Sequence, residues 1–115
     1  MEYRNLKRSL LTGIVLRKHN KRQTFEITHQ RLHIILTIQF MQDDNKRTSK
    51  RNIQTHLDAI GRSIHHINLY HQLELLVTAG YILHSDGKYT LTPAATILLI
   101  TLEKNLRKQR FERIH

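Results

Sequence analysis

Residues 79–93 of this 115-residue chain are AGYILHSDGKYTLTP, and this stretch decides the fold. The dipeptide Asp86-Gly87 separates two short runs that favour β-strands. It is a strong signal for a tight hairpin, because such a turn requires positive φ angles at its central residues. Thr92-Pro93 then starts a helix, since threonine caps helices and the N–H that proline lacks has no partner in the first turn. The sequence therefore predicts a hairpin over residues 81–91 followed directly by a helix over 93–113.

Apolar residues recur at helical spacing in three segments before this hairpin, namely 28–42, 49–60 and about 63–79. The first segment is apolar on more than one face, so we expect that helix to be buried on several sides. The start of the third helix is left open between Ser63 and Asn68, because the linker that precedes it is longer than a minimal turn.

The ends of the second helix carry their own signals. Thr48-Ser49 offers a hydroxyl that can accept from backbone N–H groups, and Asn52 stands at the third helical position. Gly61 is suited to the left-handed conformation that often follows the last turn of a helix. The sequence therefore predicts a short, capped helix in front of the long linker.

The N-terminal residues 1–23 mix an apolar cluster with a basic run, and their periodicity fits either a helix or two strands. Of these two, a helix is favoured. We expect this segment to be a dimerisation element or a basic arm that reaches along DNA, and residues 24–115 to form one domain. A chain of this size can bury one modest core.

The chain carries 19 Lys and Arg against 9 Asp and Glu, a formal net charge of +10. Such a field attracts polyanions, either nucleic acid or an anionic membrane surface. Cysteine is absent, which excludes disulfides, thiol catalysis and cysteine-based zinc sites. No apolar stretch is long enough to span a membrane, and no N-terminal signal segment is seen, so a cytoplasmic protein is expected.

The segments AGYI at 79–82 and YTLTPA at 89–94, together with the order of helices around them, resemble winged helix-turn-helix transcriptional regulators of the MarR and PadR type. The resemblance covers roughly residues 28–103. It implies a mainly α (α+β) fold with a short two-stranded β-wing. It also implies that the third helix recognises DNA and that the long C-terminal helix forms a homodimer. The chain departs from these families in its longer linker before the third helix. Its short wing has Lys88 as its clear cation and lacks the arginine-bearing tip of MarR proteins.

This resemblance implies a sequence-specific regulator that binds double-stranded DNA with its recognition helix in the major groove. Asn and Gln can pair with adenine, whereas cations neutralise phosphates. The candidate DNA-binding residues are Lys50, Arg51, Arg62, Ser63, His65, His66, Asn68, Tyr70, His71, Gln72 and Lys88. The candidate dimerisation residues are Ile97, Leu98, Ile100, Leu102 and Leu106, because a monomer would expose much of this apolar surface.

An alternative function within the same fold is a protein-protein or DNA-architectural module of a replication or mobile-element complex. The excess of cations favours DNA binding. Histidines at 29 and 33, and at 65, 66 and 71, suggest a metal sensor, but a chain this rich in histidine pairs them by chance, and no metal site is expected. No catalytic motif, cofactor motif or membrane-binding segment is recognised, so we expect no enzyme. Nothing in the sequence identifies a small-molecule effector, which would bind between the recognition and dimer helices.

Overall fold

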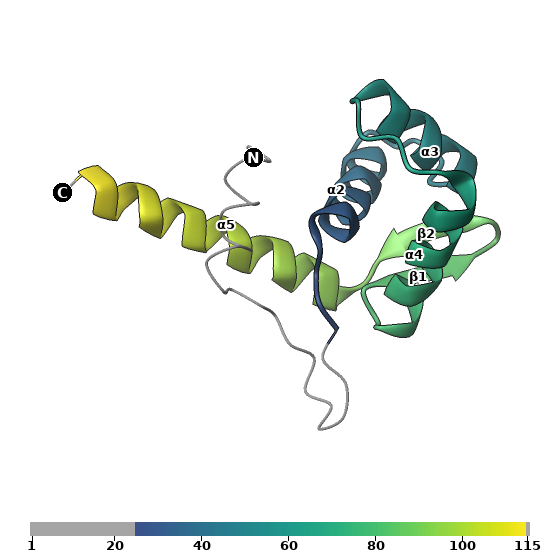
Figure 1. The fold of residues 1–115 in the computed structure, drawn as a ribbon. Helices are drawn as coiled ribbons and strands as arrows, with labels where there is room; N and C mark the ends of the chain where they lie inside the picture. The colour runs from purple at the N-terminus through teal and green to yellow at the C-terminus, as the bar shows by residue number, and fades with distance from the viewer. Residues whose placement is uncertain (1–24, 115) are drawn as a thin grey trace.

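The computed structural model describes residues 25–114 of the chain (Figure 1). In chain order the described elements are α2 (His29–Asp43), α3 (Lys50–Ala59), α4 (His66–Thr78), β1 (Ile82–Ser85), β2 (Lys88–Leu91) and α5 (Pro93–Ile114). The described chain is therefore mainly helical with one small antiparallel sheet, as the sequence predicts for the α+β class. The basic segment predicted at 1–23 lies outside the described residues.

Helix α2 lies at the centre of the fold and contacts α3, α4 and β2. Its N-cap is Thr28, whose Oγ1 accepts from the backbone N–H of Arg31 (3.2 Å). The expectation of burial on several sides is confirmed for six of its residues: Leu32, Ile34, Ile35, Thr37, Ile38 and Met41. Phe40, in contrast, is 52% exposed.

Helix α3 begins and ends at the predicted signals. Oγ of Ser49 accepts from the N–H of Asn52 (3.2 Å). After the last turn, Gly61 has a φ of +74°, and the next N–H, of Arg62, donates to the carbonyl of Leu57 (2.8 Å). This left-handed ending satisfies carbonyl groups that the helix leaves without partners.

Helix α4 starts at His66, within the range from Ser63 to Asn68 that the sequence left open. The N-cap is His65, whose Nδ1 accepts from the N–H of Ile67 (3.4 Å). Ser63 lies in the linker and does not cap the helix. The linker is attached to the rest of the fold, since Ile64 is buried and its carbonyl accepts from Nε2 of Gln54 on α3 (3.3 Å).

The predicted hairpin is confirmed. Strands β1 and β2 pair from Ile82 opposite Leu91 to Ser85 opposite Lys88, and the turn residues Asp86 and Gly87 have φ angles of 53° and 71°. These angles are those that favour Asp-Gly in a two-residue hairpin turn.

Two contacts hold β2 against the helices. The N–H of Tyr89 donates to the carbonyl of Thr48, just before α3 (3.0 Å). The N–H of Leu91 donates to Oε1 of Gln42 at the end of α2 (3.0 Å). The position of the hairpin relative to α2 and α3 is thereby fixed.

Helix α5 follows the hairpin at the predicted Thr92-Pro93. The Thr92 hydroxyl donates to the carbonyl of Gly80 (2.6 Å) and accepts from the N–H of Ala95 (3.4 Å). From there α5 extends away from the side of the molecule on which α4 and the hairpin lie (Figure 1). No helix among residues 25–114 is both long and apolar enough to cross a membrane.

Candidate functional site

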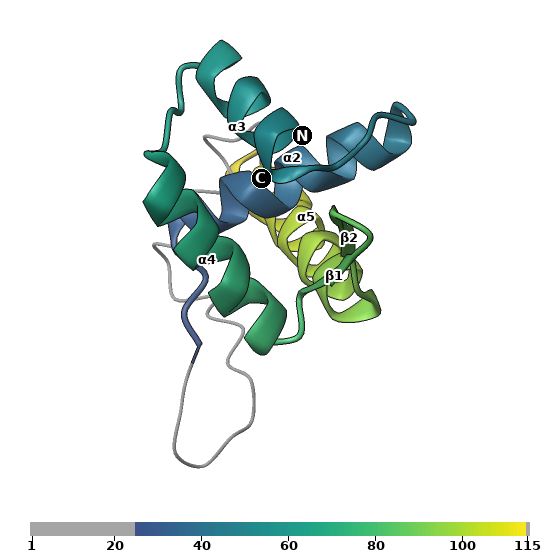
Figure 2. The same cartoon turned by 90° about the vertical axis from the view of Figure 1, so that its right-hand side faces the viewer.

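Helix α4 buries one side and exposes the other. Leu69, Leu73 and Leu76 are buried, while the opposite side presents polar and aromatic residues to solvent. The exposed residues of α4 are His66, Ile67, Asn68, Tyr70, His71, Glu74 and Thr78. Figure 2 views the molecule from the side that carries α3, α4 and the hairpin, with α5 running behind them. We call the exposed side of α4 together with the start of α3 and the hairpin turn the polar face.

The start of α3 contributes cations to this polar face. Nζ of Lys50 lies over the ring of Tyr70, 5.4 Å from its centroid. A cation so placed is attracted by the negative face of the ring, a contact that contributes about 0.5–1 kcal/mol at an exposed site. Arg51 is exposed next to it. Two predicted residues, Lys50 and Tyr70, are therefore brought together.

A second group of cations lies where the hairpin meets the segment before α3, and the sequence prediction missed two of its three members, Lys46 and Arg47. Nη2 of Arg47 donates to the carbonyl of Asp86 in the turn (3.2 Å). A cavity of about 390 Å³ is lined by Gln42, Asn45, Lys46, Arg47, Thr48, Lys88 and Thr90. The predicted cation Lys88 thus shares a surface with Lys46 and Arg47. The signal available in the sequence was the Lys46-Arg47 pair, which precedes Thr48 and the N-cap residue Ser49.

Gln72 is less available for contact with a DNA base than the sequence predicts. It is only partly exposed, and its Oε1 accepts from Nε of Arg31 on α2 (2.9 Å). Arg31 is itself held, because it lies over the Phe25 ring (4.4 Å) and donates to the carbonyl of Glu26 (2.6 Å). Pairing with adenine requires a donor and an acceptor from the same amide. Since the oxygen of Gln72 is turned toward Arg31, its NH₂ group is the part left for a ligand.

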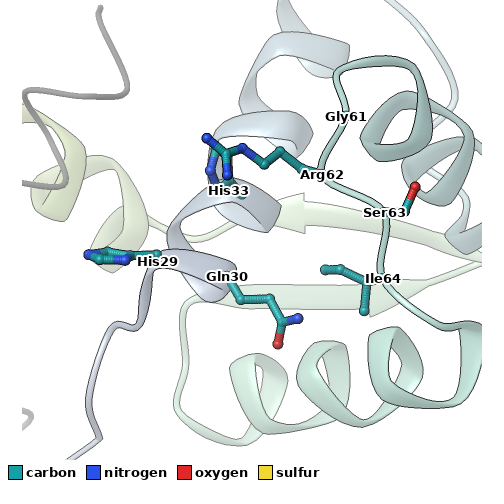
Figure 3. Close-up of a pocket in the computed structure, with 7 residues that line it drawn as sticks. All are labelled: His29, Gln30, His33, Gly61, Arg62, Ser63 and Ile64. Atoms are coloured by element: carbon teal, nitrogen blue, oxygen red, sulfur yellow. The ribbon is translucent and has the colours of Figure 1, made fainter.

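The predicted residues Arg62 and Ser63 belong to a different site. They lie in the linker between α3 and α4 and face the first turns of α2 across a pocket (Figure 3). His33, on the α2 side, is partly buried. Burial in the first place, and the charges of Arg62 and His29 in the second, lower the pKa of His33 to about 4.

The two histidines at the start of α4 contact each other and the first turn of the helix. The rings of His65 and His66 lie 4.3 Å apart, and His65 also caps the helix. No group of three or more His, Asp or Glu side chains within residues 25–114 is arranged to hold a metal ion.

The residues predicted for dimerisation fall into two sets. Leu98, Leu102 and Leu106 are buried within the single chain, with exposures of 8% or less. Ile97 and Ile100 are 61% and 47% exposed. The expectation that a monomer exposes this apolar stretch therefore applies to Ile97 and Ile100, and is wrong for the three leucines.

Comparison of the chain with models of protein families, with curated proteins and with solved structures gives no match. The case for function therefore rests on the chemistry and placement of the chain's own residues.

Proposed function

We propose that the chain is a winged helix-turn-helix protein that binds double-stranded DNA and regulates transcription as a homodimer. In this proposal α3 and α4 form the helix-turn-helix, α4 enters the major groove, and the β1–β2 hairpin is the wing. The observation that carries the proposal is the polar face, on which the exposed side of α4 is flanked by cations from α3 and the hairpin.

The chemistry of this face suits a nucleic acid. Lysine and arginine neutralise phosphates and release counterions, which supplies much of the affinity of DNA-binding proteins. Asn68 can pair with a base edge in the major groove, and Tyr70, His66 and His71 can contact phosphates or sugars. Lys50 lies on the ring of Tyr70, so an ordered cation is held beside the centre of α4.

In this proposal the wing is short, and it contributes to DNA binding because of where its turn lies. Its turn consists of Asp86 and Gly87, and Arg47 donates to the carbonyl of Asp86. Arg47 and Lys88 therefore supply phosphate contacts at the edge of the polar face. The wing does not need to enter the minor groove.

Binding to a random duplex at low salt tests the proposal, with fluorescence anisotropy as the readout. We expect binding at about 50 mM salt that weakens steeply as salt rises, because each phosphate contact contributes about 0.9 to the slope of log K against log salt. Absence of binding at about 50 mM salt would overturn the proposal.

Two double variants with the same change in net charge separate local contacts from the general basic field. Arg51→Gln with Lys88→Gln removes two exposed cations of the polar face, while Lys104→Gln with Lys108→Gln removes two exposed cations of α5. We expect the first pair to lower the salt slope by about two contacts and the second pair to leave it nearly unchanged. If both pairs lowered the salt slope equally, the chain would bind DNA through its general positive charge and not through the polar face.

A further inference from the structure

A polar pocket of about 310 Å³ lies between the first turns of α2 and the linker that joins α3 to α4. Its lining consists of His29, Gln30 and His33 from α2 and Gly61, Arg62, Ser63 and Ile64 from the linker (Figure 3). None of these seven residues is acidic. The pocket therefore combines one permanent cation, two titratable imidazoles, an amide and a hydroxyl.

The pocket places Arg62 of the linker opposite the histidines of the first turns of α2, and of these His33 is the one that Arg62 approaches (Figure 3). Histidines at positions 29 and 33 are four residues apart on α2 and so share a face of that helix. Figure 3 shows the side chain of Arg62 reaching from the linker toward His33. The guanidinium group of arginine presents several N–H donors in a planar fork that matches the oxygens of carboxylate, sulfate or phosphate groups.

The electrostatics of the pocket also favour an anion. Burial, and then the charges of Arg62 and His29, lower the pKa of His33 to about 4. Arg62 from the linker and His29 from α2 are the charged and titratable groups that act on His33. A protonated His33 is therefore disfavoured in the empty pocket, and an anion placed between these groups would stabilise it.

The backbone of the linker is fixed without a ligand. The N–H of Arg62 donates to the carbonyl of Leu57 (2.8 Å), and the carbonyl of Ile64 accepts from Nε2 of Gln54 (3.3 Å). Ligand binding therefore does not have to order a loop, which removes one of the usual costs of association.

We infer that this pocket binds a small oxyanion, a molecule that carries a carboxylate, sulfate or phosphate group. Arg62 donates from the linker, and the imidazole of His33 donates from the facing side of α2. The site differs from the polar face proposed to bind DNA, since none of its lining residues belongs to that face.

Titration with sodium sulfate, followed by NMR of backbone amides and histidine side chains, tests this inference. Sodium chloride at equal ionic strength is the reference, and no DNA is present, so the result does not depend on the proposed function. We expect saturable shifts at residues 61–64 and at the His33 ring. Shifts that do not saturate, or that saturate only on α4 and the hairpin, would overturn the site.

Arg62→Gln is the main variant, with Arg51→Gln as its matched control because Arg51 is exposed on α3 and does not line the pocket. A charge-assisted hydrogen bond accounts for about tenfold in affinity or more, so we expect Arg62→Gln to weaken sulfate binding by about tenfold. Arg51→Gln should leave it unchanged. Equal affinities in the two variants would overturn the role of Arg62. Amide spectra without sulfate verify that both variants are folded.

A second readout uses pH between about 4 and 6.5, the range that the lowered pKa of His33 concerns, and the charge of sulfate stays constant there. We expect the wild-type chain to bind sulfate more tightly at the lower pH, because the bound anion raises the pKa of His33 and binding takes up a proton. His33→Gln should reduce this pH dependence. An unchanged pH dependence in His33→Gln would exclude His33 as a donor to the anion.

Discussion

At the scale of single residues, His33 links the stability of the fold to pH. Its pKa in the folded chain is about 4, against 6.5 for an ordinary histidine, chiefly because its ring is partly buried on α2. Between these two values the unfolded chain binds a proton that the folded chain does not. The stability that His33 contributes is therefore fully present above pH 6.5 and is lost as the pH falls toward 4.

We expect the free energy of unfolding of the wild-type chain to fall between pH 6.5 and about pH 4, and His33→Gln to show a smaller fall. Urea unfolding at a series of pH values measures both. His71→Gln, which removes an exposed histidine of α4, is the matched control. The same fall in His33→Gln as in the wild type would exclude His33 as the cause.

Individual residues also show where sequence reasoning reaches its limit. The exposure of Asn68 and Tyr70 follows from helical periodicity, which is a local property. The contact of Gln72 with Arg31 joins residues 41 positions apart, and no local pattern encodes it. The same holds for Arg47 at the hairpin turn, 39 positions from Asp86. Contacts of this kind arise from packing of the whole chain.

At the scale of elements, two glycines with the same backbone conformation form a matched pair. Gly61 after α3 and Gly87 in the hairpin turn have φ angles of +74° and +71°. A Cβ at Gly61 would meet nothing within 4 Å, whereas a Cβ at Gly87 would lie 3.3 Å from Nη2 of Arg47. Because that atom ends a flexible side chain, it can move aside, and the backbone conformation is the main cost at both positions.

We therefore expect Gly61→Ala and Gly87→Ala each to lower the free energy of unfolding by about 1–2 kcal/mol. Urea unfolding at neutral pH measures both losses. A loss at Gly87 with none at Gly61 would indicate that the contact with Arg47, and not the φ angle, sets the cost. A variant at a surface position such as Thr78 on α4, Thr78→Ala, controls for a general effect of substitution and should change stability by about 0.5 kcal/mol or less.

Element ends were predicted where a local chemical rule applies. Ser49, Thr92 and the Asp86-Gly87 turn each follow from the hydrogen bonds or φ angles that one residue type provides. The start of α4 could be predicted only to within the range from Ser63 to Asn68, because a histidine, His65, caps the helix, and histidine is not among the residues that usually mark a helix start.

At the scale of the whole molecule, the arrangement of exposed apolar residues bears on assembly. Ile97 and Ile100 lie one turn apart in the first turns of α5, and both are exposed. The proposed homodimer uses this exposed pair. The buried Leu98, Leu102 and Leu106 stabilise α5 within its own chain.

We expect the wild-type chain to have the mass of a dimer in light scattering at micromolar concentration, and Ile97→Gln with Ile100→Gln to shift it toward the monomer. Leu83→Gln is the matched control, because Leu83 is 59% exposed on β1 and lies outside the proposed dimer surface. A monomeric wild-type chain would contradict the dimer, and a dimer unaffected by the α5 variant would contradict this surface.

The same two-fold symmetry predicts the form of the DNA site. Two copies of α4 related by a two-fold axis would contact half-sites about one helical turn apart, so the preferred sequence should be palindromic. Selection of bound sequences from a random duplex pool measures this directly. The α5 double variant should lose the palindrome yet retain the half-site, since its polar face is intact, while Asn68→Ala should relax the preference at one position of each half-site. If a monomeric variant still selected a palindrome, the symmetry of the DNA site would not arise from dimerisation through the α5 surface.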